Sequence, residues 1–211
     1  MTDNTQLSPG DRTMALQNLS EDIYLTEDEY LKTEPAAKVR REYIDGQVYA
    51  LAGAGYNHNC IAGNIFGNLR THLKGKLCVP FMSDMKVRLN KDYVYPDVVV
   101  DGSKMSGTDM FSENPGLLVE VLSRSTRKTD AAVKLLRYIN LPSLQEYVRI
   151  ESDFVSVQVL RRHKHWLSEY YFLGDAVTFE AIGLTLTVEE IYDREDNTDM
   201  NEFRHEMQSN A

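Results

Sequence analysis

The chain lacks any long apolar run, since none of its stretches approaches the ~20 consecutive apolar residues that span a bilayer. Residues 1–14 show no basic start followed by an apolar segment, so no signal peptide is expected. The chain has only two cysteines, Cys60 and Cys78, and neither lies in a Cys-x-x-Cys or Cys/His cluster. We therefore expect a cytoplasmic protein with no membrane partner, in which both cysteines are reduced core residues.

Familiar catalytic and cofactor motifs are also missing. The sequence contains no Gly-x-Ser-x-Gly elbow, no P-loop, no Gly-x-Gly-x-x-Gly loop and no His-Glu-x-x-His pair. His163 and His165 are two histidines in a basic stretch, which alone make a poor case for a metal site. The chain therefore lacks the motifs of the common hydrolases, nucleotide-binding proteins and zinc proteases. No organic cofactor is expected.

A strongly basic balance is absent as well, because the formal net charge is -9. The acidic excess lies at the two ends: residues 1–34 and residues 189–211 each hold 8 acids and 2 bases. Residues 35–188 hold 16 acids and 19 bases, so the body of the chain is mildly basic. This distribution permits a phosphate-rich ligand, whereas a solvated surface with acidic tails is the plainer alternative.

The length of 211 residues and the hydrophobic fraction of 42% suit one domain with short appendages. Residues 1–20 are polar and contain Pro9-Gly10, which predicts a disordered N-terminal segment. We expect a single domain over residues 21–192 and an acidic tail over residues 193–211.

Apolar periodicity and capping residues predict an alternation of helices and strands. Thr26 followed by Glu29 is typical of a helix start, and Asp45-Gly46 is typical of a tight turn between strands. Helices are expected over residues 24–34, 58–73, 127–140 and 187–192. Strands are expected over residues 43–51 (as a hairpin), 79–89, 97–100, 117–122, 146–150, 154–160 and 166–172. This order predicts an α/β or α+β fold with a mixed sheet.

Two carboxylates interrupt apolar strands. Glu120 lies within Gly116-Leu-Leu-Val-Glu-Val-Leu122, and Asp97 follows Pro96 at the head of an apolar run. A buried carboxylate costs several kcal/mol unless it is paired or bound to a metal. If the two strands are neighbours the acids converge, and two like charges held close need a cation or a shared proton. Alternatively, Glu120 faces solvent and Asp97 is a turn residue.

Three further side chains are weaker candidates from the residues alone. Glu42 precedes the hairpin, where an exposed acid beside two arginines would be unremarkable. Lys134 shares a helix face with Arg127, Asp130 and Tyr138, a polar stripe that is more often solvated. His58 opens a helix and could contact phosphate or substrate, although a helix-start histidine without clustered partners is more often structural.

The ordered combination of these residues is more specific than any one of them. It comprises Glu42-Tyr-Ile-Asp-Gly46, His58-Asn59, Tyr95-Pro-Asp-Val-Val-Val100, Leu118-Val-Glu-Val-Leu-Ser123, then Asp130, Lys134, Tyr138 and Glu146-Tyr147. Over about residues 24–192 the chain resembles the Uma family of endonucleases, which belongs to the PD-(D/E)XK restriction-endonuclease-like superfamily. The resemblance implies a restriction-endonuclease-like core with a central mixed β-sheet flanked by helices.

The resemblance also implies a metal site. Asp97 and Glu120 would be the principal ligands of Mg²⁺, for which Mn²⁺ can substitute. Glu42 would contribute through the metal or one of its waters, and the backbone carbonyl of Val121 would be a further ligand. His58, Arg124, Arg127, Lys128 and Tyr138 would contact the substrate, with Arg137 helping to attract its backbone.

One position departs from the superfamily pattern. Leu122 stands where a lysine usually follows the second acid by two residues. Lys134 on the next helix resembles a migrated substitute, and Gln145 and Lys86 are alternatives. The catalytic set implied is thus Glu42, Asp97, Glu120 and Lys134.

The resemblance predicts a Mg²⁺-dependent endonuclease that acts on DNA, as a homodimer because cutting both strands often uses two sites. Two other hypotheses remain open at this point. The chain could be a non-cleaving module that binds nucleic acid or a protein partner on the same fold, or a structural domain stabilised by a metal.

Overall fold

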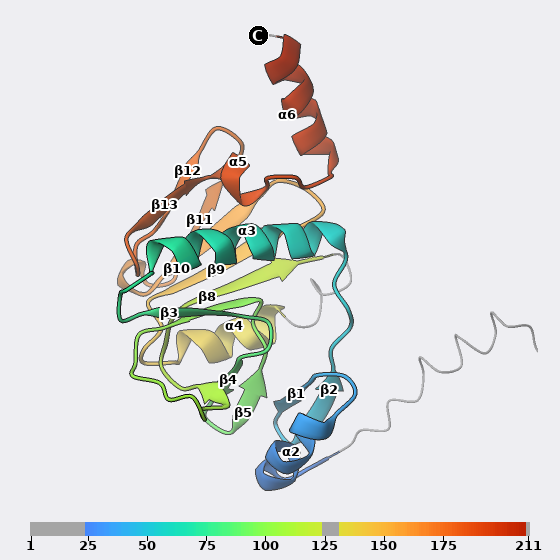
Figure 1. Ribbon diagram of the computed structural model, residues 1–211, viewed down its shortest axis with the longest axis vertical. Helices are drawn as coiled ribbons and strands as arrows, with labels where there is room; N and C mark the ends of the chain where they lie inside the picture. Colours follow the sequence, from blue (N-terminus) through green and yellow to red (C-terminus); the bar gives the residue numbers. More distant parts are fainter. Residues whose placement is uncertain (1–23, 124–130, 210–211) are drawn as a thin grey trace, which may run out of the picture. The chain divides into compact units, whose positions relative to one another are not determined.

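A computed structural model of the chain describes residues 24–123 and 131–209 (Figure 1). The chain divides into two compact units, Met1–Leu51 and Ala52–Ala211. The predicted disordered segment, residues 1–20, lies outside the described residues.

The N-terminal unit is a short helix followed by a hairpin: α2 (Glu27–Thr33), η1 (Glu34–Ala36), β1 (Arg41–Ile44) and β2 (Gln47–Ala50). Thr26 and Glu29 form the predicted capping box at the start of α2. Asp45 and Gly46 both have positive φ, 51° and 84°, which the two-residue turn of an antiparallel hairpin requires. The Tyr30 ring stacks on Tyr43 at 5.0 Å, so the helix packs on the hairpin. Both predictions for this segment are confirmed.

The second unit is built on a six-stranded sheet in the order β11-β10-β9-β8-β6-β3. Strands β8 and β9 run parallel and the other neighbours are antiparallel, so the sheet is mixed as predicted. Its strands are β3 (Val79–Met82), β6 (Val98–Asp101), β8 (Pro115–Leu122), β9 (Glu146–Glu151), β10 (Val157–Arg161) and β11 (Ser168–Tyr171).

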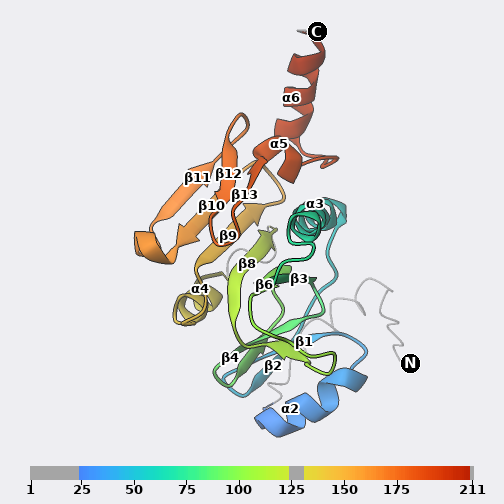
Figure 2. The ribbon, with the colours of Figure 1, turned by 60° about the vertical axis from the view of Figure 1, so that its left-hand side comes forward.

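Helices cover both faces of this sheet. Figure 2 shows α3 (Tyr56–His72) on one side of β8 and α4 (Ala131–Ile139) on the other. Alternate residues of β6 and β8, among them Val98 and Val119, belong to the hydrophobic core under α3. On the opposite face the ring of Tyr138 from α4 packs edge-on against Tyr147 of β9 at 5.1 Å. The mixed α/β architecture is therefore the one expected from the sequence.

The remaining elements of this unit surround the sheet. Strand β4 (Lys86–Leu89) pairs with β5 (Asp92–Val94) and β7 (Phe111–Ser112), and β12 (Ala176–Phe179) pairs with β13 (Leu184–Thr187). A 3-10 turn η2 (Arg162–Lys164) follows β10, and α5 (Val188–Ile191) and α6 (Thr198–Ser209) end the described chain. In the described part of the chain, no helix is long and apolar enough to cross a membrane.

Several element predictions need correction. The single strand expected over residues 79–89 is wrong, because the chain breaks at Ser83 into β3 and β4. Ser83 adopts φ 52°, and its N–H donates to the carbonyl of Asp97 at 3.0 Å. Strand β5 and the hairpin of β12 and β13 were not anticipated, and the expected acidic tail contains α6. The helix expected over residues 127–140 is present as α4, with its predicted first residues outside the described range.

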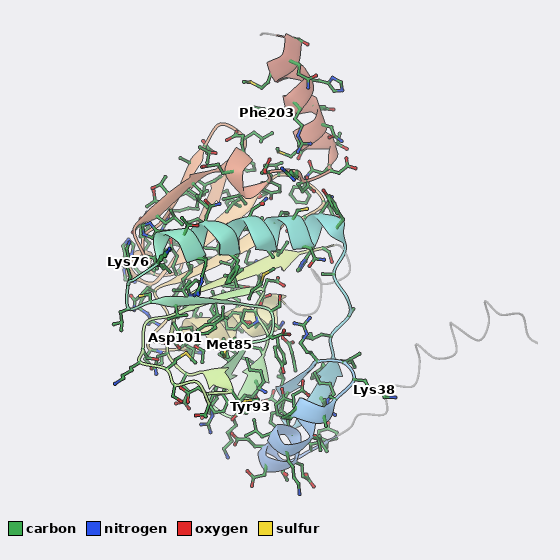
Figure 3. The ribbon with its side chains drawn as sticks, in the orientation of Figure 1. Lys38, Lys76, Met85, Tyr93, Asp101 and Phe203 are labelled. Carbon is green, nitrogen blue, oxygen red and sulfur yellow. The ribbon has the colours of Figure 1, made fainter. Side chains whose placement is uncertain are left out.

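Asp101, labelled in Figure 3, fixes the loop that joins β6 to β8. Its Oδ1 accepts hydrogen bonds from the N–H and the hydroxyl of Ser103, at 2.7 and 2.5 Å. Its Oδ2 accepts from the hydroxyl of Ser112 and from the N–H of Asn114. Burial raises the pKa of Asp101, but these hydrogen bonds outweigh it and the net direction is downward. The carboxylate thereby holds both ends of the loop and so the pairing of the two strands.

Glu195, which follows α5, makes the free energy of unfolding depend on pH. Its side chain is fully buried, and neither carboxylate oxygen has a hydrogen-bond partner among the described residues. Burial raises the pKa of Glu195 from 4.5 to about 7, against the opposing charge of Arg204. Between these two values the folded chain retains a proton that the unfolded chain loses, so the free energy of unfolding falls as pH rises through this window.

We predict that Glu195→Gln flattens this dependence. The neutral amide cannot ionise, so the variant should exceed the wild type in stability above pH 7 by up to about 3 kcal/mol, and this gain should vanish below pH 4.5. Urea unfolding at a series of pH values measures the effect, with the exposed Glu202→Gln as the matched control. Curves of wild type and Glu195→Gln that stay parallel across this range would contradict the prediction.

Candidate functional site

The pairing of β6 with β8 brings two carboxylates together. In this antiparallel register Val98 lies opposite Val119 and Val99 lies opposite Leu118. Asp97 directly precedes β6, and Glu120 follows Val119 on β8, so the two acids stand one residue beyond the Val98–Val119 pair. The prediction that the two acid-bearing strands are neighbours is thus confirmed.

Asp97 is held by one of its two oxygens. Its Oδ2 accepts a hydrogen bond of 2.7 Å from the backbone N–H of Val121 and lies 3.3 Å from Nε2 of His58. Its Oδ1 has no hydrogen-bond partner among the described residues, and the side chain is 17% exposed. One oxygen is therefore anchored to the protein while the other remains available to a ligand.

His58 comes from the first turn of α3, and its Nε2 lies 3.3 Å from Oδ2 of Asp97. Burial lowers the pKa of His58, but the hydrogen bond with Asp97 and the charges of Asp97 and Glu120 raise it, and the net direction is upward. The ring nitrogen Nδ1 is buried and has no hydrogen-bond partner among the described residues. The predicted substrate residue His58 therefore lies at the acid pair and donates to one member of it.

Glu120 is anchored by α4. Its Oε1 accepts a hydrogen bond of 2.7 Å from the Tyr138 hydroxyl and lies 3.9 Å from the ammonium nitrogen of Lys134. These two side chains are four residues apart, so they stand on one face of the helix, one turn from each other. Glu120 is 8% exposed and Lys134 is 6% exposed. Burial of this charge pair without a function would be costly, since a buried pair rarely stabilises more than apolar packing would.

The donor set fits a hard divalent cation. Mg²⁺ takes oxygen ligands, is held by one or two carboxylates and keeps several waters. Asp97 and Glu120 supply two such carboxylates on adjacent strands. Residues 24–123 and 131–209 contain no group of three or more His, Cys, Asp and Glu side chains placed to hold a metal.

The other predicted residues are placed as follows. Glu42 is buried on β1 of the N-terminal unit, so its part in the site stays a prediction. Arg124, Arg127 and Lys128 lie outside the described residues. Arg137 pairs with Asp92 of β5. The carbonyl of Val121 as a metal ligand also stays a prediction.

The three candidates for the lysine of the site, Lys134, Gln145 and Lys86, lie in different surroundings, and which of them serves the site stays a prediction. Gln145 donates its backbone N–H to the carbonyl of Gly116, four residues from Glu120, which is about 13 Å along a strand. The ammonium of Lys86 lies 5.9 Å from the ring centre of Tyr95. The ammonium of Lys134 lies 3.9 Å from Oε1 of Glu120.

Sequence reasoning missed Arg149. The parallel register of β8 and β9 places it beside Glu120, on the same face of the sheet. The available signal was the one that marked Glu120, namely a charged residue inside the otherwise apolar run Tyr147–Ile150. It was overlooked because an arginine in an alternating strand reads as a solvent-facing residue.

Comparison with known proteins assigns the chain to a family. A model of Uma2, described as "Putative restriction endonuclease", matches residues 27–189. The chain belongs to the Uma2 family. The matched range includes Glu42, Asp97, Glu120 and Lys134, and the resemblance inferred from the sequence is confirmed.

The chain is also similar to individual proteins. The Uma2 chain is 34% identical over 174 residues to the uncharacterized protein slr1290 of Synechocystis sp., covering 80% of this chain and 91% of that one. It is also 34% identical over 150 residues to the uncharacterized protein sll1609 of the same organism, covering 68% and 85%. Among solved structures, "a putative nuclease belonging to DUF820" from Anabaena variabilis matches with a TM-score of 0.68 at 19% identity, over 80% of this chain and 97% of that one. This last likeness establishes the fold.

Proposed function

We propose that this Uma2-family protein is a metal-dependent endonuclease that hydrolyses phosphodiester bonds in DNA. The observation that carries the proposal is the acid pair itself. Asp97 stands at the start of β6 and Glu120 on the neighbouring strand β8, and a buried lysine lies 3.9 Å from Glu120. An acid pair with an adjacent ammonium suits a reaction in which a polyanion is attacked by water.

Hydrolysis of a phosphodiester is chemically difficult, which explains why the two acids and a cation would be needed. The attacked phosphate already carries negative charge, so it repels a nucleophile and gains further charge in the transition state. Asp97 and Glu120 would hold Mg²⁺, or Mn²⁺ in its place. When bound, such an ion supplies Lewis acidity, withdrawing charge from phosphate oxygens and favouring ionisation of water.

The protein's own groups orient this centre. The N–H of Val121 and the ring of His58 fix Oδ2 of Asp97, which leaves Oδ1 for the cation. Tyr138 fixes Oε1 of Glu120 by a hydrogen bond of 2.7 Å. Carboxylates whose rotamers are locked in this way bind a cation with little further loss of side-chain entropy.

Lys134 would act on the substrate. Its ammonium is buried beside Glu120, where a positive charge interacts more strongly with a phosphate oxygen than it would in water. We assign it to stabilise the charge that develops on the phosphate or to orient the attacking water. Arg124, Arg127, Lys128 and Glu42 are proposed to assist, and a homodimer is proposed because two sites are needed to cut both strands.

The test is cleavage of supercoiled plasmid DNA by the full chain in Mg²⁺, in Mn²⁺ and in EDTA. We expect nicked and linear products with either ion and none in EDTA. Glu120→Gln should be inactive in all three conditions, and Glu202→Gln, an exposed residue of α6, should match the wild type.

The outcomes separate the alternatives. Intact plasmid in every condition, or equal nicking by wild type and Glu120→Gln, would refute the proposal. A non-cleaving binding module should retard the plasmid on a gel without cutting it, with or without Glu120. A purely structural metal should raise the melting temperature and leave DNA untouched.

A further inference from the structure

A row of polar side chains extends from the acid pair across the sheet. The register of β8 with β9 places Arg149 beside Glu120, and the register of β9 with β10 places Gln158 beside Arg149. The register of β10 with β11 places Tyr170 beside Gln158. All these positions lie on the face opposite the hydrophobic core under α3, since Val148, Val157 and Val159 belong to that core.

The members of this row are hydrogen-bonded in sequence. Nη1 of Arg149 donates to Oε1 of Gln158 at 3.1 Å. Nε2 of Gln158 donates to the hydroxyls of Ser168 and Tyr170, at 2.7 and 3.0 Å. We call Arg149, Gln158, Ser168 and Tyr170 the donor row. Gln158 uses its acceptor on the arginine and its donors on the two hydroxyls, so it fixes the positions of the other three.

The donor row has hydrogen-bond donors that no group in the described part of the chain uses. Each hydroxyl accepts from Gln158 and donates to no other group in the described part of the chain, so both hydroxyl protons remain available. Tyr170 is 55% exposed, which leaves its hydroxyl accessible. A ligand here must therefore supply acceptors.

Arg149 adds a positive charge to the donor row, which favours a ligand whose acceptors are negatively charged. Among the described residues its guanidinium has no carboxylate within 4 Å, and its buried Nε–H has no hydrogen-bond partner. A buried donor left unsatisfied costs about 1–3 kcal/mol, and native proteins keep few such groups. A planar guanidinium with unused donors matches the oxygens of a phosphate.

The position of the donor row relates it to the proposed chemistry. It begins one strand from Glu120 and ends at β11, the edge strand of the sheet. Three strand spacings make about 14 Å from Glu120 to Tyr170. Successive phosphates of one DNA strand rise about 3.4 Å along the helix axis, so this length spans several of them.

We propose that the donor row binds the sugar-phosphate backbone of the nucleic acid next to the phosphate being cut, with Arg149 as the charged contact. The proposal rests on the nuclease function proposed above. Arg149 forms an ion pair with a backbone phosphate, and Ser168 and Tyr170 donate to phosphate oxygens further along the strand. Contacts of this kind set the position of the strand over Asp97 and Glu120 without reading its sequence.

The experiment measures binding apart from cutting. Fluorescence anisotropy of a short labelled DNA duplex is recorded with the full chain in EDTA, over a range of NaCl concentrations. Arg149→Gln should weaken binding about tenfold and reduce the slope of log K against log salt by about 0.9, the value for one lost phosphate contact. Tyr170→Phe should weaken binding about fivefold with an unchanged slope, because a neutral hydrogen bond releases no counterion.

Two controls guard against trivial causes. Arg149→Lys keeps the charge and should retain the slope, which a merely structural role would not predict. Arg70→Gln removes an exposed arginine from α3 and should change neither affinity nor slope. Thermal unfolding checks that each variant is folded.

The results distinguish this proposal from the nuclease proposal. Equal effects of Arg149→Gln and Arg70→Gln, or no effect of Arg149→Gln, would overturn the donor row even if the wild type cuts DNA. A wild type that binds the duplex with the predicted Arg149 dependence but never cuts it would support the donor row and refute the nuclease. Absence of binding by the wild type would overturn both.

Discussion

Asp97→Asn is expected to lower DNA cleavage by about a thousandfold or more while leaving the chain folded. The change removes one of the two charges proposed to hold the cation, whose contribution to the transition state is several kcal/mol. Each 1.36 kcal/mol corresponds to a tenfold change in rate. The asparagine carbonyl can still accept the Val121 N–H that Oδ2 of Asp97 accepts at 2.7 Å, so the strand end should keep its geometry.

Two measurements together identify the cause of this loss. Single-turnover cleavage in Mn²⁺ gives the rate, and thermal unfolding with and without Mn²⁺ reports whether the ion still binds, because a ligand that binds the folded state raises the melting temperature. We expect Asp97→Asn to lose both the cleavage and the Mn²⁺-dependent rise. In EDTA its melting temperature should equal or exceed that of the wild type, since a repulsion between two carboxylates has been removed.

Asp193→Asn is the matched control, because Asp193 is an exposed acid near the end of the chain. It should cut DNA and respond to Mn²⁺ like the wild type. Cleavage by Asp97→Asn within tenfold of the wild type would remove Asp97 from the metal site. Loss of cleavage with an unchanged Mn²⁺ response would mean that the ion binds elsewhere.

The acid-bearing strands could be predicted because each acid violates a local rule. Glu120 interrupts an apolar run and Asp97 follows a proline at a strand head, so both stand out in a single sequence. Their convergence required only that β6 and β8, joined by residues 102–114, pair with each other. The loop between β6 and β8 allows this pairing. Asp101 holds the two ends of the loop together by accepting hydrogen bonds from Ser103 and Ser112.

What the sequence could not reveal depends on contacts between distant segments. The N–H of Ser83 still bonds to the carbonyl of Asp97, 14 residues further along, but its φ of 52° ends the strand, and no turn-forming glycine or proline marks the break. Arg149 acquires its position only from the parallel pairing of β8 with β9, which places it beside Glu120. Local pattern constrains single elements, whereas register between non-adjacent strands is a tertiary property.

A place for Lys134 near the acids was suggested by its helix, which follows the Glu120 strand, and by the resemblance, although a polar helix stripe usually faces water. The structure instead buries Lys134 against the sheet, with Tyr138 one turn away on the same acid. A helix that packs its polar face inward must satisfy those groups there. Glu120 accepts the hydrogen bond of Tyr138 and pairs with Lys134, which explains why these three polar residues lie together in an apolar layer.

Lys134→Met is therefore the second variant with a large expected effect. Methionine has a similar length and no charge, so it fills the same space without the ammonium. We expect single-turnover cleavage to fall about a hundred- to a thousandfold at saturating Mn²⁺, the range observed when one group that stabilises transition-state charge is removed. Binding of Mn²⁺ should be retained or strengthened, because a positive charge 3.9 Å from Glu120 opposes a second cation there.

Stability supplies an independent readout for the same variant. Removing one member of a buried charge pair leaves the other partly uncompensated, so Lys134→Met should melt lower than the wild type in EDTA. Added Mn²⁺ should restore much of that loss by neutralising Glu120, yet cleavage should stay low. A lysine needed only for folding would instead give a variant that recovers activity together with stability.

Two other lysines complete the test. Lys74→Met, at an exposed position after α3, should behave as the wild type in all three measurements. Lys86→Met removes the ammonium that lies 5.9 Å from the ring centre of Tyr95 and should cut DNA far faster than Lys134→Met. If Lys86→Met were instead the inactive variant and Lys134→Met cut normally at saturating Mn²⁺, the functional lysine would belong to β4, and the burial of Lys134 would serve only to pair Glu120.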